Sequence, residues 1–387
     1  MTSDNLRTPA AARSILSGPV IARILTGWAA VGTVILTEPG SIPQLPGFLL
    51  AAILAALVVV IAYCAFGVVQ QAEHLARRLG DPYGSLILTL SIVIIEVILI
   101  GAVMLGPGES ATIARDSVMA VSMVILNLVV GISLLAGALR HGSLRLNSAG
   151  SSTYLAMLIV LISFGLIMPG AIGDDGAYTA PQQVIVVIIT IAVYAFFLLR
   201  QTTAEAGDYR EPVSLVAGHE QQGDVPSEGV ARVLREHRAE VLTRAAVLVV
   251  TVLPIVLLSH DMAALLDDGL GRLDAPIALA GLLIAMIVFL PEGITAVRAG
   301  LSGEAQRVIN LCHGALVSTV SFTIPAVLLI GLATGQTVVL AESGVNVVLL
   351  AVTMLVTITN FSAPKLTVMH ALPHLMTFGV YVLLLFR

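Results

Sequence analysis

Charge is scarce in this sequence of 387 residues, because only 11% of them are Asp, Glu, Lys or Arg, against roughly a quarter in ordinary soluble domains. This excludes a water-soluble globular domain. Lysine is almost absent, since Lys365 is the only one, and the net charge is −5. The chain therefore lacks the basic surface that binds a nucleic-acid backbone. The two cysteines, Cys64 and Cys312, both lie in apolar runs, which favours packing and gives no support for a disulfide framework.

Apolar residues are abundant instead: 57% of the chain is hydrophobic, in runs of bilayer-spanning length from end to end. Such runs predict an all-α polytopic membrane protein. We expect 11 transmembrane helices, at about 18–37, 47–69, 84–105, 117–139, 153–170, 182–199, 244–260, 276–298, 308–333, 343–359 and 367–386.

The distribution of basic residues orients these spans, because cytoplasmic loops collect Lys and Arg. With 11 spans and a cytoplasmic N-terminus, 16 of the 19 basic residues fall on the inside, and only Arg115, Arg272 and Arg387 fall on the outside. One miscounted span would reverse every later loop and destroy this asymmetry. We therefore expect the N-terminus in the cytoplasm and the C-terminus outside.

When the first span is set apart, one long polar segment divides the other ten spans into two halves of five. An odd number of spans per half makes the halves enter the membrane from opposite sides, as in the inverted repeats of many secondary transporters. We expect a tail with the first helix at 1–46, a first five-helix repeat at 47–200, a cytoplasmic linker at 201–243 and a second repeat at 244–387. Within the linker, 230–241 has the spacing of an amphipathic surface helix.

Two acids, Glu96 and Glu292, lie deep inside predicted spans, and a shift of 196 residues superposes them when 84–101 is aligned with 280–297. Each lies about 12 residues into its segment, roughly 18 Å and hence near the middle of a ~30 Å apolar core. Because the two helices run in opposite directions, the carboxylates can meet at one depth. An ionised group at the bilayer centre costs at least ~2.5 to 3.5 kcal/mol and usually marks an ion or proton path.

The surroundings of the second acid suit a hard cation, which prefers oxygen ligands. Pro291 removes a helical hydrogen bond and frees the Ile287 carbonyl, and Pro325 does the same for the Ser321 carbonyl. The helices that follow the acids add polar side chains, at Ser122, Asn127, Ser318, Thr319, Ser321 and Thr323. Each of these also fits a plain bond between membrane helices.

Histidine adds a titratable group to this region. His313 lies in the ninth span near the polar residues and can relay protons, because imidazole titrates near neutrality; a hydrogen-bonded structural histidine is the alternative. His370 and His374 share a face of the last helix, but a metal site there is not expected, since no third ligand is near in sequence.

Four stretches of this sequence resemble the bacterial ChaA-type proton-driven calcium antiporters of the calcium/cation antiporter superfamily. They are Leu88-Thr89-Leu90-Ser91 through Glu96, Asn127-Leu128-Val129-Val130-Gly131, Phe289-Leu290-Pro291-Glu292-Gly293, and 309–316 through 323–327. The resemblance covers nearly all of the chain after the first span. It implies one extra helix plus two inverted five-helix repeats, and a cation site formed by Glu96 and Glu292 with polar residues of the following helices. A bacterial inner membrane is the location expected with it.

Two departures from the superfamily pattern are informative. Many members carry Gly-Asn before the first acid, whereas residues 91–95 precede Glu96 here. Sodium-coupled relatives carry extra carboxylates near the places of Asn127 and Thr319, so their absence argues against sodium coupling.

Charge balance gives the expected mechanism. Two buried glutamates are neutralised by one Ca²⁺ or by two protons, so the two loads exclude each other, and an empty doubly charged site is costly to occlude. The sequence predicts a secondary active transporter, without a cofactor, that exports cytoplasmic Ca²⁺ against protons across the lipid bilayer.

Three rival functions were weighed. Na⁺/H⁺ or K⁺/H⁺ antiport at the same site stays open, because two carboxylates do not fix the charge of the ion. A cation channel is the remote alternative. An intramembrane enzyme is not expected, because the chain has no His-Glu-x-x-His motif, and Gly131-Ile132-Ser133 lacks the glycine of a serine signature.

Overall fold

The computed structural model describes residues 15–36, 46–79, 111–209, 238–273, 276 and 278–386, together with 93, 97, 100, 101 and 104. The chain forms two compact units, one of residues 1–91 with 214–269 and one of residues 92–213 with 270–387. In the described residues the secondary structure is helical, apart from isolated β-bridges.

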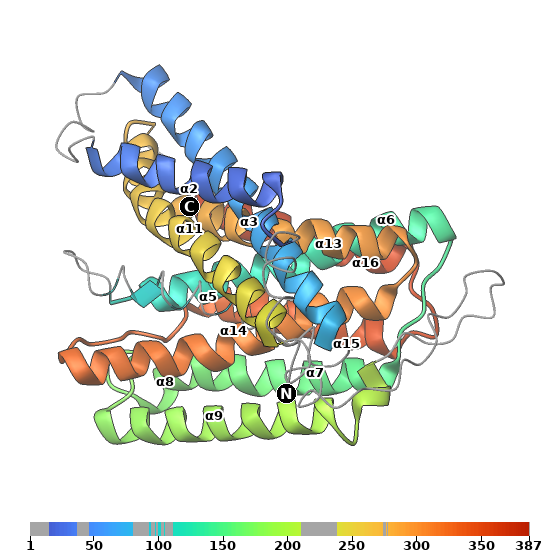
Figure 1. The fold of residues 1–387 in the computed structure, drawn as a ribbon. Helices are drawn as coiled ribbons and strands as arrows, with labels where there is room; N and C mark the ends of the chain where they lie inside the picture. Colours follow the sequence, from blue (N-terminus) through green and yellow to red (C-terminus); the bar gives the residue numbers. More distant parts are fainter. Residues whose placement is uncertain are drawn as a thin grey trace, which may run out of the picture. The chain divides into compact units, whose positions relative to one another are not determined.

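The first unit contains three helices, α2 (Gly18–Leu36), α3 (Gly47–Leu79) and nearly all of α11 (Arg238–Gly271). Gly27 brings α2 close to its neighbours, since a Cβ there would lie 2.9 Å from a Pro254 side-chain carbon. Small residues allow such close packing between membrane helices. The Trp28 indole N–H donates to the Val250 carbonyl at 3.1 Å, and Arg23 donates to Gln70 at 2.5 Å. These contacts join α2 to α3 and α11 (Figure 1).

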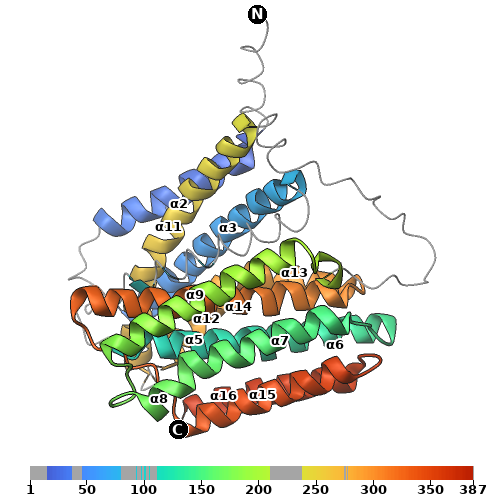
Figure 2. The ribbon, with the colours of Figure 1, turned by 90° about the horizontal axis from the view of Figure 1, so that it is seen from below.

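The second unit holds the other helices (Figures 1 and 2). They are α5 (Ile113–Met123), the π-helix η2 (Val124–Val129), α6 (Val130–His141), α7 (Ser148–Ile162), the π-helix η3 (Ser163–Ile167), α8 (Met168–Ile172), α9 (Ala180–Thr202), the 3₁₀-helix η4 (Ala206–Tyr209), α12 (Ala278–Val288), α13 (Leu290–Leu301), α14 (Ala305–Thr334), α15 (Gly344–Ser362) and α16 (Val368–Leu385).

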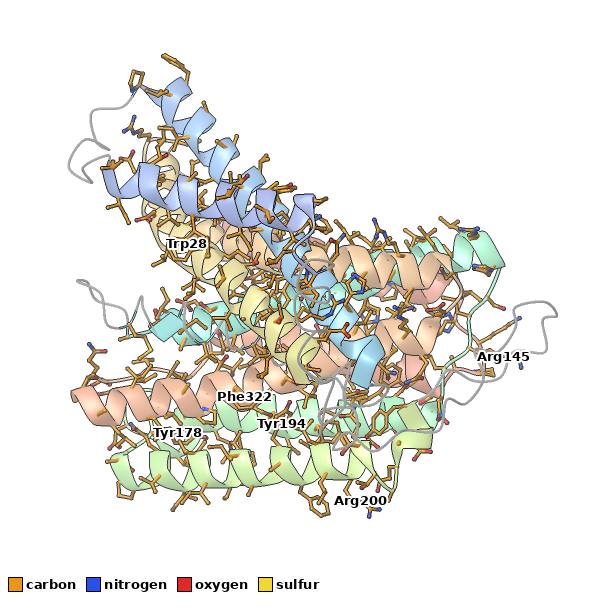
Figure 3. All side chains as sticks on the ribbon, viewed as in Figure 1. Trp28, Arg145, Tyr178, Tyr194, Arg200 and Phe322 are labelled. Carbon is orange, nitrogen blue, oxygen red and sulfur yellow. The ribbon has the colours of Figure 1, made fainter. Side chains whose placement is uncertain are left out.

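The long helix α14 lies at the centre of this unit. Nineteen of its 30 residues are buried, and it packs against α7 and α9, which run beside it in both views, and against α13 (Figures 1 and 2). A helix that is apolar all round must be buried or face lipid. On the α9 side, the ring of Tyr194 meets the edge of Phe322, with centroids 5.3 Å apart (Figure 3).

The prediction of an all-α membrane protein is confirmed. In the described part of the chain, nine helices are long and apolar enough to cross a membrane, or ten if the bent pair α12–α13 is one span. Each of them falls on one of the predicted ranges. The remaining range, 84–105, lies almost wholly outside the described residues, so the total of 11 stays a prediction.

The predicted span at 276–298 is not a straight helix, because the chain bends by 59° where α12 passes into α13. Phe289 leaves the helical conformation, with φ −88° and ψ 5°, and Pro291 stands in the first turn of α13. Pro291, which was predicted to remove a helical hydrogen bond, therefore stands at the start of a new helix. Proline suits the first turn of a helix, because the N–H groups there have no partner inside the helix.

The two compact units do not coincide with the predicted repeats, because compactness groups α2 and α3 with α11. Compact units group residues that contact one another, whereas repeats are segments with the same internal topology. The boundaries of the predicted repeats therefore stay a prediction. Of the predicted linker 201–243, the structure describes 201–209 and 238–243. The predicted surface helix at 230–241 lies outside the described residues except for its last four, which begin α11.

Candidate functional site

Glu292 lies in the first turn of α13, directly after the bend. A carboxylate is stabilised at this end of a helix, where backbone N–H groups carry partial positive charge. The sequence places the acid there because Phe289, Pro291 and Gly293 cluster around it: the first leaves the helix, the second starts the next one, and the third carries no side chain. The bend thus places an acidic group, with both carboxylate oxygens buried, inside an otherwise apolar span.

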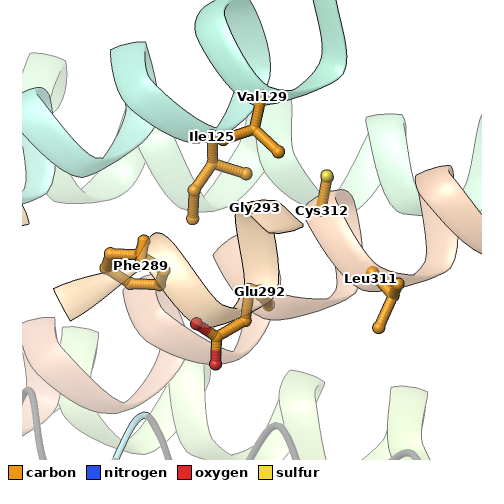
Figure 4. A pocket seen from close by; sticks show the side chains of 8 residues that line it. Ile125, Val129, Phe289, Glu292, Gly293, Leu311 and Cys312 are labelled. Atoms are coloured by element: carbon orange, nitrogen blue, oxygen red, sulfur yellow. The ribbon is translucent and has the colours of Figure 1, made fainter. Parts of the chain in front are cut away.

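A small pocket adjoins this glutamate (Figure 4). Its volume is about 10 Å³, roughly what one water molecule or a bare ion occupies. The wall is largely apolar, and Figure 4 shows the carboxylate turned away from Ile125 and Val129. The lining side chains include Ile125, Val129, Phe289, Leu311 and Cys312.

Two glycines hold α13 against α6, and so fix the position of Glu292. A Cβ on Gly300 would lie 2.2 Å from the Ser133 carbonyl oxygen, and a Cβ on Gly137 would lie 2.5 Å from the Gly300 oxygen. Real Cβ atoms do not approach an oxygen so closely, so both positions require glycine. The backbones of α6 and α13 are in direct contact here, and each helix contributes one of the two glycines.

The polar residues of α14 point in different directions. Cys312 and Ala315 line the Glu292 pocket. Ser318 donates to the Gly314 carbonyl at 2.9 Å and lies 2.7 Å from the Tyr194 hydroxyl on α9. Since the serine proton is used by Gly314, the tyrosine is the donor in the second bond. Ser318 therefore faces α9.

Thr319 and Ser321 are also buried in α14, with 0% and 1% of their surfaces exposed. Thr319 lies four residues after Ala315 and so shares the face of α14 that lines the pocket. Ser321, whose carbonyl was a predicted ligand, does not line the pocket. Ile287, the other predicted carbonyl ligand, lies near the end of α12.

Asn127 lies on the π-helix η2, which also supplies Ile125 and Val129 to the pocket. Its amide nitrogen donates to the Thr353 hydroxyl on α15 at 2.9 Å. The side chain therefore points toward α15. π-helical turns inside α-helices occur frequently at functional sites, and η2 carries both Asn127 and two pocket residues.

Glu96, the predicted partner of Glu292, lies outside the described residues. The pairing of the two carboxylates therefore stays a prediction, as do the ligand roles of Asn127, Ser318 and Thr319.

His313, the predicted proton relay, is 1% exposed and packs against the ring of Phe361 on α15, with centroids 5.3 Å apart. It follows Cys312 by one residue, about 100° around the helix, and so lies on a different face from the pocket. His370 and His374 bond to different partners. His370 Nδ1 accepts a hydrogen bond from the Thr367 backbone N–H at 3.2 Å, and His374 Nε2 lies 2.9 Å from the Asn360 amide nitrogen.

A polar stripe on α15, formed by Thr353, Thr357 and Asn360, was not predicted from the sequence. All three are buried. Their spacing of four and three residues, inside an otherwise apolar helix, puts them on one face. This spacing was visible in the sequence and indicates a buried polar seam.

Comparison with known proteins identifies the family. The family model described as "Sodium/calcium exchanger protein" matches residues 49–203 and 243–387. The chain belongs to this exchanger family. The predicted resemblance is thereby confirmed, and a multi-pass membrane protein of a cation-exchanger family is established.

Two curated relatives of this exchanger have similar sequences. "Sodium-potassium/proton antiporter ChaA" of Escherichia coli (strain K12) is 32% identical over 324 residues, covering 83% of this chain and 85% of that protein. "Putative ionic transporter y4hA" of Sinorhizobium fredii is 33% identical over 327 residues, covering 82% and 84%. Both names describe transporters and neither describes an enzyme.

Solved structures share the fold of this exchanger at low identity. The H⁺/Ca²⁺ exchanger CAX has a TM-score of 0.66 at 12% identity, over 94% of this chain and 87% of that one. The Ca²⁺/H⁺ antiporter protein YfkE has a TM-score of 0.64 at 13% identity, over 97% and 99%. The sodium-calcium exchanger NCX_Mj has a TM-score of 0.56 at 14% identity, over 87% and 98%.

Proposed function

We propose that this exchanger moves Ca²⁺ out of the cytoplasm in exchange for external protons, by alternating access at a site formed by Glu96 and Glu292. The observation that carries the proposal is the place of Glu292: an acid at a helix break, inside an apolar span, beside a pocket with room for one ion. Intramembrane acids of this kind usually mark ion or proton pathways.

The charge of the site supports coupled exchange rather than a channel. A carboxylate in surroundings of low dielectric constant is stabilised by a cation or by a proton, so the two compete for it. A pair of glutamates then takes one Ca²⁺ or two protons, and only a loaded, neutral site is easily occluded. Thr319 shares the pocket face of α14 and is the best placed of the predicted oxygen ligands, since Asn127 is bonded to Thr353 and Ser318 faces α9.

Calcium is the favoured cargo for two reasons. One divalent ion balances two carboxylates, and the structural neighbours CAX and YfkE bear names that describe Ca²⁺/H⁺ exchange. The second candidate is exchange of K⁺ or Na⁺ for protons at the same site. The name of the Escherichia coli relative, a sodium-potassium/proton antiporter, favours it. The bacterial inner membrane is the proposed location.

The test uses everted vesicles that carry a pH gradient reported by a fluorescent dye. Addition of Ca²⁺ should collapse the gradient in the wild type, and Glu292→Gln and Glu96→Gln should reduce this response at least tenfold. Glu304→Gln is the matched control, because Glu304 is exposed and pairs with Arg307 at 2.9 Å. A normal response of Glu292→Gln vesicles would contradict the proposed site.

The same vesicles decide the cargo. A response to Ca²⁺ at a concentration at which K⁺ and Na⁺ have no effect supports the calcium proposal. A response to K⁺ or Na⁺ without one to Ca²⁺ replaces it with the second candidate.

A further inference from the structure

A second group of buried titratable side chains lies on α14 and α16, outside the lining of the Glu292 pocket. His313 on α14 and His374 on α16 are each 1% exposed, and the two side chains interact electrostatically. Asn360 on α15 joins them: its amide nitrogen donates to the His370 carbonyl at 3.1 Å and lies 2.9 Å from Nε2 of His374. Three helices therefore meet at a pair of histidines.

The hydrogen bonds of this pair are incomplete. An amide nitrogen only donates, so Nε2 of His374 is the acceptor, and the neutral ring carries its proton on Nδ1. In the described residues no side chain hydrogen-bonds this Nδ1 or either ring nitrogen of His313. The remaining polar contacts of the two rings are to backbone, of His374 to Leu126 and of His313 to Ile309. Two buried imidazoles with so few partners call for an explanation, such as water, an ion or a functional role.

An open cavity with several serine hydroxyl groups lies next to Phe361, the aromatic neighbour of His313. It has a volume of about 550 Å³ and lies between the start of α7 and the end of α15, where Ser148, Ser152 and Ser362 contribute hydroxyl groups. Phe361 is part of its wall and also packs against His313, with ring centroids 5.3 Å apart. A space of this size with several hydroxyl groups can hold water. The Phe361 ring therefore contacts both the cavity and one of the histidines.

A positive charge on the pair would be poorly balanced in the described packing. Among the described residues, His374 is the one titratable side chain that acts electrostatically on His313. Two like charges so close would repel, so the pair takes one proton at most. The titratable groups on α14, on α16 and on the helices packed against them are Arg115, Asp116, Arg140, His141, Tyr154, Tyr194, Arg200, Glu292, Arg298, Arg307, Cys312, His370 and Tyr381.

We propose that His313 and His374 form a second proton-binding site, reached through the serine-lined cavity and separate from the cation-binding glutamates. The described packing holds the pair neutral. A proton passes from cavity water to an imidazole nitrogen, and the resulting imidazolium is stable only when Phe361 moves aside and water reaches it. Acid on the cavity side therefore favours a conformation in which this wall opens. The inference rests on the proposed exchange for its effect on transport, but not for the binding itself.

Cysteine labelling tests the binding itself. Ser152→Cys places a thiol in the cavity, while the native Cys64 and Cys312 are buried. A maleimide reacts with the thiolate form of cysteine, so the measured rate is divided by the thiolate fraction found with a free thiol standard. The corrected rate should rise at least threefold when the pH is lowered from 8 to 6. His313→Gln or His374→Gln in the same chain should abolish that rise. His370→Gln, on the same helix as His374 but bonded to Thr367, should leave it intact. A rise that survives in both histidine variants would overturn the proposal.

Transport gives a second readout. In wild-type vesicles the exchange rate should change with pH on the cavity side around pH 6.5, the ordinary range of histidine. His374→Gln should flatten this profile at least threefold while the cation concentration for half-maximal rate changes less than twofold. A parallel loss of cation affinity would mean that the histidines belong to the cation site, against the proposal.

Glu292→Gln separates the two ideas. If exchange stops in this variant while Ser152→Cys labelling keeps its pH dependence, the second site stands by itself. If exchange continues in this variant, the proposed function fails without affecting the labelling result. If the variant loses the pH dependence of labelling, the histidine pair is not separate from the glutamates and the inference fails.

Discussion

At the level of single residues, the hydrogen bond from Tyr194 to Ser318 links α9 to α14 inside the protein. Tyr194→Phe removes the donor and keeps the ring contact with Phe322. A buried hydrogen bond contributes about 1 kcal/mol, so we expect the thermal midpoint of the purified protein to fall by about 2 °C. Tyr63→Phe is the control, because Tyr63 is 38% exposed and meets Arg23 through its ring. An unchanged midpoint for Tyr194→Phe would show that the bond contributes nothing.

Glu342 predicts a pH effect on stability. It lies in the loop between α14 and α15, where burial raises the pKa of its carboxyl group, against opposing contributions from Asn346 and Arg115. A raised pKa means that the folded protein binds the proton more tightly than the unfolded chain does. Stability should therefore fall as the pH rises above about 4.5, the ordinary value for this group.

Glu342→Gln tests this effect, because it removes the ionisation while keeping the shape of the side chain. We expect the thermal midpoint at pH 7 to rise by about 2 °C and its decline between pH 4.5 and pH 7 to become shallower. Glu304→Gln, on an exposed helix end, should leave the slope unchanged. An equal slope in wild type and Glu342→Gln would contradict the assignment.

Much of the candidate site could be predicted from residue type, but its partners could not. An acid in the middle of an apolar span stands out, and so Glu292 was found. The direction in which Ser318 and His313 point was not predictable, because most of α14 is buried and the helix carries no strong amphipathic pattern to orient it. The same holds for Asn127 on the largely buried η2. Their partners Thr353, Tyr194 and Phe361 are far away in sequence and depend on helix packing.

At the level of helices, the contact between α6 and α13 depends on glycine. Gly300→Ala places a methyl group 2.2 Å from the Ser133 oxygen, so the helices must separate. Overpacking of this kind costs typically 1–3 kcal/mol, and it shifts the helix that carries Glu292. We expect both a lower thermal midpoint and at least a tenfold loss of exchange in vesicles.

Gly281→Ala is the matched control for this prediction. Gly281 lies on α12, and a Cβ there would meet nothing within 4 Å. Since alanine also stabilises a helix relative to glycine, this variant should be at least as stable as the wild type. If Gly300→Ala keeps full exchange, the close contact does not position Glu292.

The sequence predicted helices better than their irregularities. Apolar runs gave the positions of ten described spans, since a bilayer requires a minimum length of apolar helix. A lost helical hydrogen bond at Pro291 was predicted, but not the 59° bend that separates α12 from α13. The π-helical turns at η2 and η3 had no signal that we recognised, because they depend on the packing of neighbouring helices as much as on local residues.

At the level of the whole second unit, its loops separate into two groups. Leu144 and Leu366 exchange backbone hydrogen bonds of 2.8 Å, His141 bonds the Leu301 carbonyl at 2.8 Å, and Asn310 bonds the Tyr209 carbonyl at 2.6 Å. All these residues lie in or beside loops that the basic residues assign to the cytoplasm. The loops around 173–179 and 335–343 are joined in the same way, through Gly176 with Leu340 and Ala341.

This grouping agrees with the number of spans predicted for the second unit, because a missing span would bring an inside loop next to an outside one. The positive-inside rule predicts that the group of loops containing Arg140, Arg145 and Lys365 faces the cytoplasm.

Labelling from one side of the membrane measures this orientation. Lys365→Cys and Gln336→Cys place exposed thiols in the two groups of loops, while the native cysteines are buried. An impermeant maleimide should react with Gln336→Cys in intact cells and with Lys365→Cys only in everted vesicles. The opposite result would reverse the orientation and with it the proposed direction of calcium movement. Reaction of both from one side would contradict the separation of the loops, and hence the path of α14 to α16 through the membrane.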